Sequence, residues 1–388
     1  MKVKQSPEDF VVEELTDIIP GDRGDFAFYR LDKIGWATPD ALAAIRRRWD
    51  IELRRMSYGG LKDRHASTTQ YLTIHHGPRR NLKHHGVTLS YLGNVTRPYG
   101  SSDIRANRFA VTLRDLDPAE RDTINARFTA LATLGVPNYF DDQRFGSVSG
   151  PGGEFIGRLL VQRQFEEALK LALAGPYAHD DAATKVEKQT LRDYWGDWAT
   201  CKDRLPRGHA RSLIDYLRVH PGDFKGAVVR LRPELRGLYL SAYQSYLWNR
   251  MLSRWIEQHT TPETRRLVEQ RLGPVPFPLV LDADAAREYA ALQLPLPSVR
   301  WKSEENDGRL TLVESVLAEE GLTLREMQVR GVRELFFSRG ERPARIAIRE
   351  GTVEWSDDDH HRGRLRLTMR FELERGSYAT LVIKGLTG

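Results

Sequence analysis

The sequence has only one cysteine, Cys201, among its 388 residues. A single thiol excludes an intramolecular disulfide framework and any zinc site built from several cysteines. The chain also lacks an uninterrupted run of roughly 18 apolar residues, the length that a membrane-spanning helix needs. Its first residues, M-K-V-K-Q, contain no apolar stretch of the kind found in signal peptides. We therefore expect a cytoplasmic protein with no membrane partner.

A large excess of one charge is absent as well. The chain has 59 Lys and Arg against 53 Asp and Glu, a formal net charge of +6, with 40% hydrophobic and 29% charged residues. This composition is typical of a soluble globular protein, and the length allows two or three domains. A moderate positive charge is compatible with a nucleic-acid partner but does not require one.

One stretch concentrates reactive groups. Residues 57–74 read S-Y-G-G-L-K-D-R-H-A-S-T-T-Q-Y-L-T-I, in which the two glycines predict a turn and the alternating residues 68–74 predict a strand. Between them Asp63 stands among Lys62, Arg64 and His65. Opposite charge within a few ångströms keeps a carboxylate ionised, which suits a nucleophile or a general base. The alternative is a surface turn whose charges are merely solvated.

This stretch and several others resemble motifs of one known family. They read G-L-K-D-R-H-A followed by Thr69-Gln70, P-E-D-F-V-V-E-E (residues 7–14), P-N-Y-F-D-D-Q-R-F-G (137–146), S-A-Y-Q-S-Y-L-W-N (241–249) and R-G-S-Y-A-T (375–380). The family is the TruD family of transfer-RNA pseudouridine synthases. The motifs occur in the family's order and cover nearly the whole chain. Asp141 replaces a usual glycine, and because Asp enters left-handed conformations less freely, we expect an altered turn there with activity retained.

The resemblance implies an α+β fold. Its catalytic pseudouridine-synthase domain has a mixed, mainly antiparallel sheet, formed by residues 1–149 and 339–388, and is interrupted by an inserted, largely helical TRUD domain at residues 150–338. The residues themselves favour the same partition. G-P-G-G at residues 150–153 is the clearest linker signal, and strand-like alternation returns from Arg333 onwards.

The reaction implied by the resemblance is isomerisation of uridine to pseudouridine in RNA, typically at position thirteen of tRNA, without cofactor or metal. The target base must leave the stack so that its glycosidic bond can be reached. The expected partner is tRNA, with no small-molecule cofactor, and we expect a monomer. Asp63 is the implied catalytic residue. Whether it attacks C1′ or removes the C2′ proton is left open by the sequence.

Other site residues follow from the same motifs. Phe10, Asn138 and Tyr378 are expected to hold the base, with Phe140 as the stacking ring, although Phe10 taken alone reads as a core aromatic. The cation that pairs with Asp63 is sought among Lys4, Lys62, Arg64 and Arg144. Lys62 and Arg64 flank Asp63 and would point away from it on an extended chain, so we favour Arg144 or Lys4.

Two other functions compete with this reading. The histidine pairs 75–76 and 84–85 invite a metal site and metal-assisted RNA hydrolysis, but no carboxylate or cysteine stands at ligand spacing and adjacent residues on a strand face opposite ways. The patch R-R-N-L-K-H-H at residues 79–85 is better read as facing phosphates. The second alternative is an RNA-binding module without catalysis, against which Asp63 argues. The triplet Arg46-Arg47-Arg48 is taken as a solvated helix face rather than an RNA contact.

Several local expectations can be compared with a structure. Thr38-Pro39 predicts a helix N-cap followed by Pro at the first helical position, with Leu42, Ile45 and Trp49 buried. Residues 155–174 are expected to form one helix, 238–258 a long helix with a core stripe, and 265–291 a helix-loop-helix. Residues 107–114, 335–337 and 365–373 are expected to be strands.

Overall fold

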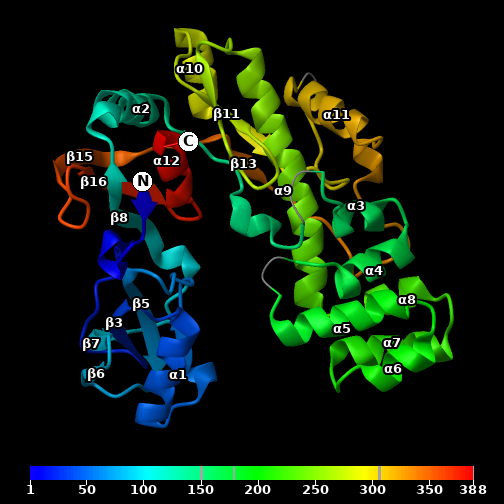
Figure 1. Ribbon diagram of the computed structural model, residues 1–388. Helices are drawn as coiled ribbons and strands as arrows, with labels where there is room; N and C mark the ends of the chain where they lie inside the picture. Colours follow the sequence, from blue (N-terminus) through cyan, green and yellow to red (C-terminus); the bar gives the residue numbers. More distant parts are fainter. Residues whose placement is uncertain (149–151, 178–179, 305–306, 388) are drawn as a thin grey trace. The chain divides into compact units, whose positions relative to one another are not determined.

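The computed structural model describes residues 1–148, 152–177, 180–304 and 307–387. The chain forms two compact units (Figure 1). Unit 1 comprises Met1–Val136 and Ile346–Thr387, and unit 2 comprises Pro137–Arg345. This unit begins before and ends after the expected insert of residues 150–338. At its start, Phe140 is bonded to Asn249 of the long helix of unit 2. The expected linker at residues 150–153 lies partly outside the described residues.

Unit 1 is built on one ten-stranded sheet with the order β15-β16-β8-β2-β5-β3-β7-β6; β1 also pairs with β8, and β4 with β5. Every pairing is antiparallel except that of β2 with β5. This confirms the mixed, mainly antiparallel sheet. The strands are β1 (Lys2–Val3), β2 (Phe10–Thr16), β3 (Phe26–Ile34), β4 (Met56–Tyr58), β5 (Ser67–His75), β6 (Leu82–His84), β7 (Val87–Val95), β8 (Ile104–Leu116), β15 (Arg349–Asp357) and β16 (Leu365–Glu374).

Helices cover this sheet. They are α1 (Thr38–Trp49), α2 (Arg121–Leu134) and α12 (Ala379–Thr387), with short 3-10 turns η1 (Pro7–Asp9), η2 (Leu53–Arg55), η3 (Ser101–Asp103) and η4 (Pro118–Glu120). Helix α1 buries Leu42 and Ile45 against Leu31 and Leu72 of the sheet, as their spacing predicts, and leaves Arg46–Arg48 in solvent. Burying such side chains contributes about 1.5–3 kcal/mol each. Helix α12 packs against α2.

Unit 2 is largely helical. It contains α3 (Ile156–Val161), α4 (Phe165–Ala174), α5 (Ala182–Asp193), α6 (Trp198–Arg204), α7 (His209–Val219), α8 (Phe224–Val229), α9 (Pro233–Gln258), α10 (Ala283–Ala291) and α11 (Arg309–Glu319), with η5 (Asp142–Phe145) and η6 (Leu324–Glu326). Its strands are β10 (Arg265–Val268), β11 (Val275–Pro278), β12 (Gln293–Pro295) and β13 (Glu341–Pro343). They form two antiparallel pairs, the β10-β11 hairpin and the pair β12-β13, whose strands are far apart in the sequence. The two-residue strands β9 (Val136–Pro137) and β14 (Arg345–Ile346) span the boundaries between the units.

Three local expectations for unit 2 were wrong. Residues 155–174 form two helices, because Arg163 adopts a left-handed φ of 62° between α3 and α4. Residues 265–278 form the β10-β11 hairpin rather than a helix, and residues 335–337 form no strand. The core stripe of α9 is confirmed: Tyr243, Leu247 and Met251 are each fully buried.

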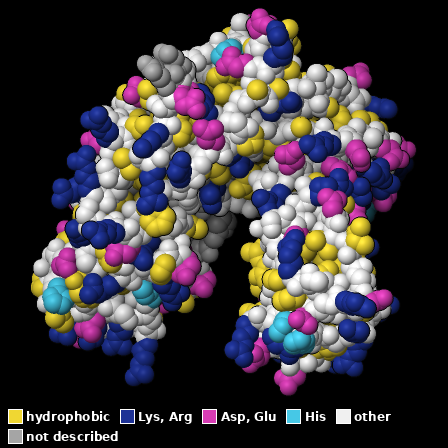
Figure 2. Space-filling model, turned by 180° about the vertical axis from the view of Figure 1, so that it is seen from behind, with side chains coloured by type: hydrophobic (Ala, Val, Ile, Leu, Met, Phe, Trp, Pro, Cys, Tyr) yellow, Lys and Arg dark blue, Asp and Glu magenta, His cyan; other side chains and the backbone are white. Residues whose placement is uncertain are grey.

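The surface carries both signs of charge. Figure 2 shows Lys and Arg side chains interspersed with Asp and Glu over the face that it displays. Among the described helices, none is long and apolar enough to cross a membrane.

Candidate active site

Asp63 lies on an irregular loop between β4 and β5, residues 59–66, here called the Asp63 loop. Its Oδ2 accepts a hydrogen bond from the ammonium of Lys4 at 2.8 Å, and the two side chains are 48% and 25% exposed. Gly59 lets the loop start close to the sheet, since a Cβ there would lie 2.6 Å from the side chain of Ile104. The result is an accessible carboxylate with one ammonium partner. Within the described part of the chain, its Oδ1 has no hydrogen-bond partner and is open to a ligand.

The other candidate cations have different partners. Lys62 turns inward to the carboxylate of Glu14 at 3.0 Å, and Arg64 turns outward to Asp40. This agrees with the argument that flanking residues point away from Asp63. Arg144 lies in unit 2, where its Nε donates to the hydroxyl of Ser245 at 3.2 Å.

Lys4 is held from a second side by an aromatic ring. Its ammonium lies 3.9 Å from the centroid of the Phe10 ring, a cation–π distance. Phe10 is 4% exposed and packs edge-on against Phe109. The Lys4 backbone has a φ of 55°, a left-handed conformation that costs free energy in a residue other than glycine. Phe10 is therefore a core aromatic whose contact with Lys4 helps to place the ammonium on Asp63.

The backbone of the Asp63 loop is bound by a buried lysine of β3. Lys33 is 1% exposed, and its ammonium donates to the carbonyl oxygens of Trp36 (2.7 Å), Asp63 (3.0 Å) and Lys62 (3.3 Å). An ammonium has three N–H donors, so these three acceptors use all of them. Burial lowers the pKa of Lys33 to about 8, while the charge of Asp63 opposes that shift. The loop backbone thus replaces the water that this cation would otherwise bind.

A second set of bonds fixes the start of the Asp63 loop. The hydroxyl of Thr38 donates to Gln70 Oε1 at 2.8 Å and accepts from the backbone N–H of Lys62 at 2.9 Å. The Gln70 amide donates in turn to the carbonyl of Gly60 at 3.2 Å. Thr38 was expected to cap helix α1, but Ala37 occupies the N-cap position. The expectation failed because the Thr38 hydroxyl is needed by this buried amide.

Glu14 of β2 holds the Asp63 loop through an ion pair with Lys62. It is fully buried, and its carboxylate contacts the Lys62 ammonium, the Tyr99 hydroxyl at 2.9 Å and the Tyr71 backbone N–H at 3.2 Å. Burial, followed by the charge of Glu14, raises the pKa of Tyr99, so its hydroxyl stays protonated and donates. The buried charges of Glu14 and Lys62 are thereby paired and hydrogen-bonded, as a dry interior requires.

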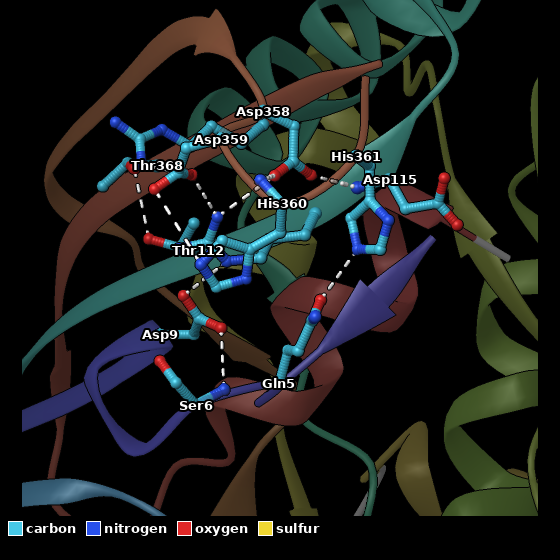
Figure 3. A network of polar contacts seen from close by, with 12 residues as sticks. Gln5, Ser6, Asp9, Thr112, Asp115, Asp358, Asp359, His360, His361 and Thr368 are labelled. Carbon is cyan, nitrogen blue, oxygen red and sulfur yellow. Dashed lines mark hydrogen bonds and ion pairs between the residues drawn. The ribbon is translucent and has the colours of Figure 1, made fainter. Parts of the chain in front are cut away.

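The N-terminal segment that carries Lys4 is anchored by a polar network (Figure 3). The buried guanidinium of Arg114, on β8, donates to Asp9 at 2.9 Å, Asp358 at 3.2 Å and Asp359 at 2.6 Å. Burial lowers its pKa, but the hydrogen bonds to Asp359 and Asp9 outweigh burial, and the pKa is raised. Asp9 also accepts from the backbone N–H of Ser6 at 2.9 Å.

The β15–β16 turn completes this network. Asp358 accepts from the backbone N–H of Asp115 at 2.7 Å and of His360 at 2.9 Å. The ring of His361 reaches Gln5 at 2.9 Å, next to Lys4 in sequence (Figure 3). The segment that positions Lys4 is therefore bonded to strands from the far end of the chain.

Asn138 and Phe140 lie together in unit 2. The Asn138 amide donates to the carbonyl of Pro343 at 2.9 Å, and its two oxygens accept from Arg342. The backbone of Phe140 forms two bonds with the side-chain amide of Asn249 at 2.8 and 2.9 Å. Asn138 and Phe140 are buried, at 4% and 6% exposure. The motif at residues 241–249 thus supplies Asn249 as a support for the Phe140 segment.

Two guanidinium groups lie near the Phe140 ring. The guanidinium of Arg342 is 4.4 Å from its centroid and that of Arg144 is 5.3 Å away. Asp141, which follows, has φ −83° and ψ 168°, an extended conformation open to any residue. The expected change of the turn at this position therefore has no conformational cause, because glycine is not required there. Tyr378 lies in unit 1, partly buried in the turn between β16 and α12.

Sequence reasoning missed Lys33, Glu14 and Arg114. Strand periodicity could have found the first two. Glu14 shares the inward face of β2 with Phe10 and Val12, and Lys33 shares that of β3 with Leu31. A charged residue in register with buried apolar neighbours indicates a buried polar site.

Known proteins resemble this chain along nearly its whole length. The family model described as tRNA pseudouridine synthase D (TruD) matches residues 1–386. The chain belongs to the TruD family. It is 30% identical to the probable tRNA pseudouridine synthase D 2 of Methanocaldococcus jannaschii, over 99% of this chain and 91% of that protein. It is 28% identical to the tRNA pseudouridine synthase D of Aquifex aeolicus, over 100% of this chain and 98% of that protein.

A solved structure has the same fold. The crystal structure of the putative TruD of Methanosarcina mazei superimposes with a TM-score of 0.78 at 25% identity, covering 99% of this chain and 92% of that one. Membership of the TruD family makes this chain a pseudouridine synthase, an isomerase that modifies tRNA.

The histidine pairs have local partners in this TruD family member. Arg55 donates to the backbone carbonyls of His75 and His76, which holds that turn. The rings of His75 and His76 lie 4.0 Å apart, and those of His84 and His85 lie 4.9 Å apart. In the part of the chain that the structure describes, no group of three or more His, Cys, Asp or Glu side chains is placed to hold a metal ion.

Proposed function

We propose that this enzyme acts on the uridine at position 13 of tRNA and that Asp63 is its catalytic residue. The observation that carries the proposal is the half-exposed Asp63 carboxylate, paired with Lys4 through one oxygen and open at the other. Position 13 rests on the reaction that the family motifs imply. No part of the proposed chemistry needs an oxidant or a cofactor, because the reaction is an isomerisation.

The bonds exchanged define what Asp63 has to do. The N1–C1′ bond of the uridine breaks, the base turns, a C5–C1′ bond forms, and the C5 proton is replaced by one on N1. An ionised carboxylate beside the ribose can start this sequence by attacking C1′ or by removing the C2′ proton. Lys4 orients the carboxylate, and the three bonds from Lys33 hold its backbone. Holding the carboxylate in position before the substrate binds lowers the activation barrier, and by more than any one of these contacts contributes alone.

The base-holding residues form two groups in this proposal. Tyr378 and Phe10 belong to unit 1, with Phe10 acting through Lys4 because the ammonium covers its ring. Asn138, Phe140 and Arg144 belong to unit 2. A base that stacks on Phe140 must displace a guanidinium from the ring, which exchanges one cation–π contact for a stacking contact.

The test is the substitution Asp63→Asn, which keeps the size of the side chain but removes its charge and nearly all of its nucleophilicity. Pseudouridine should fall below detection on a tRNA transcript in buffer containing EDTA, while tRNA affinity stays within a few-fold and the melting temperature is unchanged. Formation of pseudouridine at the wild-type rate would refute the role of Asp63. A wild-type protein that binds tRNA but makes no product would instead be a binding module.

A matched RNA separates the reaction from its position. A transcript with cytidine at position 13 should yield no pseudouridine. Product at another uridine in that transcript would leave the enzyme class intact and refute position 13. If EDTA abolishes the activity and a metal ion restores it, the result would favour a metal site at the histidine pairs.

A further inference from the structure

Phe336 is a large aromatic side chain on the surface of unit 2. Phe336 is 56% exposed, whereas its neighbours Leu335 and Phe337 are 3% and 2% exposed. Among the described residues it is the one aromatic member of the exposed large hydrophobic side chains. The buried neighbours fix the backbone on both sides, so the ring is held outward rather than left on a free chain end. An exposed aromatic ring on a fixed backbone is a common feature of ligand-stacking surfaces.

Cations surround this ring. The guanidinium of Arg300 lies 4.6 Å from the Phe336 centroid, and a hollow of about 520 Å³ beside it is also lined by Arg330 and Arg333. All three arginines are exposed. Within the described residues, none of them forms an ion pair with a carboxylate. The ammonium of Lys225 adds a fourth charge, since it would lie 2.9 Å from a Cβ placed on Gly331.

The nearby carboxylates do not neutralise these cations. Glu326 accepts from the backbone N–H and the hydroxyl of Thr323, both at 2.8 Å, and these bonds, followed by the charge of Arg330, lower its pKa. Glu334 is exposed to solvent. Within the described residues, none of the four cations near this ring forms an ion pair, and no carboxylate lines the hollow. These unpaired positive charges favour a polyanion as the ligand over a protein surface that is apolar or has few acidic residues.

We propose that this Phe336 surface binds an unpaired nucleotide of the RNA substrate, with the base on the ring and the flanking phosphates on Arg330 and Arg333. The proposal rests on the proposed function for its assumption that the ligand is RNA. Every base has a face that can stack, so the contact is tolerant of sequence. Arg300 fixes the ring and adds a cation beside the base. The surface contributes affinity and register, and takes no part in the chemical step.

Two variants test the two halves of the surface. Phe336→Ala should weaken equilibrium binding of a tRNA transcript about tenfold at fixed salt, without changing the slope of log affinity against log salt. The double variant Arg330→Gln/Arg333→Gln should reduce that slope by roughly 1.4–1.8, as expected when two phosphate contacts are lost. For both, KM should rise while kcat at saturating tRNA stays at the wild-type value.

The matched control is Leu267→Ala, an equally exposed apolar side chain of the same unit at 56% exposure, which should leave affinity unchanged. Melting temperatures report whether each variant folds, and the arginine pair provides a second test should Phe336→Ala not fold. Wild-type affinity in Phe336→Ala together with a wild-type salt slope in the double variant would overturn the proposal. So would a change of oligomeric state with unchanged tRNA binding, because the surface would then meet protein. Either result concerns tRNA binding alone and leaves pseudouridine formation by the wild type intact. Failure of the proposed function would show differently, as pseudouridine made by Asp63→Asn or as product at a uridine other than position 13.

Discussion

Replacement of Lys33 by methionine removes the charge that binds the Asp63 loop while keeping the volume of the side chain. The wild-type ammonium is buried and bonded to three carbonyl oxygens, one of them that of Asp63 itself. Methionine fills the space but donates no hydrogen bond. The three carbonyls must then find water, and the loop loses the contact that fixes the backbone of Asp63, the proposed catalytic residue.

The size of the effect follows from two opposing quantities. Burial lowers the pKa of Lys33 from 10.5 to about 8, so the buried charge costs roughly 3 kcal/mol at about 1.36 kcal/mol per pKa unit. Three hydrogen bonds from a charged donor contribute about 2 kcal/mol each. The difference predicts that Lys33→Met lowers the free energy of unfolding by about 2–3 kcal/mol. Activity should fall further, by about 100-fold in kcat, because a 1 Å displacement of a catalytic group costs about that much.

The pH profile separates positioning from simple destabilisation. The folded pKa of Lys33 lies below its unfolded value, so the unfolded chain binds more protons between about pH 8 and 10.5. The contribution of this group to stability therefore rises with pH in that window. Above about pH 8, however, the neutral amine has only two N–H donors for three carbonyls. We therefore expect kcat to fall as the pH rises through 8. The titration of Lys33 should not lower the melting temperature over the same range.

The assay is single-turnover pseudouridine formation at saturating tRNA between pH 6.5 and 9, with melting temperatures at each pH. Lys185→Met is the control, since Lys185 is an exposed residue of α5 in unit 2. It should retain the wild-type rate and the wild-type alkaline decrease. Lys33→Met should lose the alkaline decrease that is due to this amine. A Lys33→Met enzyme with wild-type kcat and an unchanged pH profile would refute the reasoning.

Three further predictions concern neighbouring parts of the molecule. Lys4→Met should lower kcat by 10- to 1,000-fold with tRNA affinity nearly unchanged, because Asp63 loses its partner at 2.8 Å; equal losses in kcat/KM and binding would contradict an orienting role. Asp358→Asn should cost about 2–3 kcal/mol in urea unfolding, since it weakens a buried ion-pair network without emptying it; a change within 0.5 kcal/mol would mean that the network is not needed for stability. Arg79→Gln/Arg80→Gln should reduce the salt slope of tRNA binding by roughly 1.4–1.8, and an unchanged slope would show that this exposed patch does not meet phosphates.

The strands and long helices were predictable because their patterns are carried by many residues. Strands β5, β8 and β16 alternate over most of their length, and α9 repeats its buried side at helical spacing. The misses depend on single residues or on distant partners. Helix α3 ends where Arg163 adopts a left-handed backbone conformation. No glycine or proline stands there to indicate the end of a helix in the sequence. Residues 265–278 form a sheet of two strands, β10 and β11, and the prolines of this segment are typical of loops.

The candidate site was predictable in part for the same reason. The motif gave Asp63, and elimination of its neighbours left two cations, one of which, Lys4, forms the ion pair. The supporting residues could not be placed from local sequence, because each acts across the fold. Lys33 donates a hydrogen bond to the backbone of Asp63, thirty residues away in the sequence. Arg114 forms ion pairs with both Asp9 and Asp358. Only the paired sheet brings such residues together.

The order of strands in the sheet has a consequence for the way the protein matures. The hydroxyls of Thr112 and Thr368 meet across β8 and β16 although 256 positions separate them in the chain. During synthesis the whole of unit 2 emerges before β15 and β16, and domains generally fold as they appear. The carboxylates of the β15–β16 turn are thus the last groups to reach Arg114 and anchor the segment bearing Lys4. A nascent chain can fold most of its mass before the ion pair of Lys4 and Asp63 gains this support. Maturation therefore ends at the candidate site, with a slow closure of distant strands.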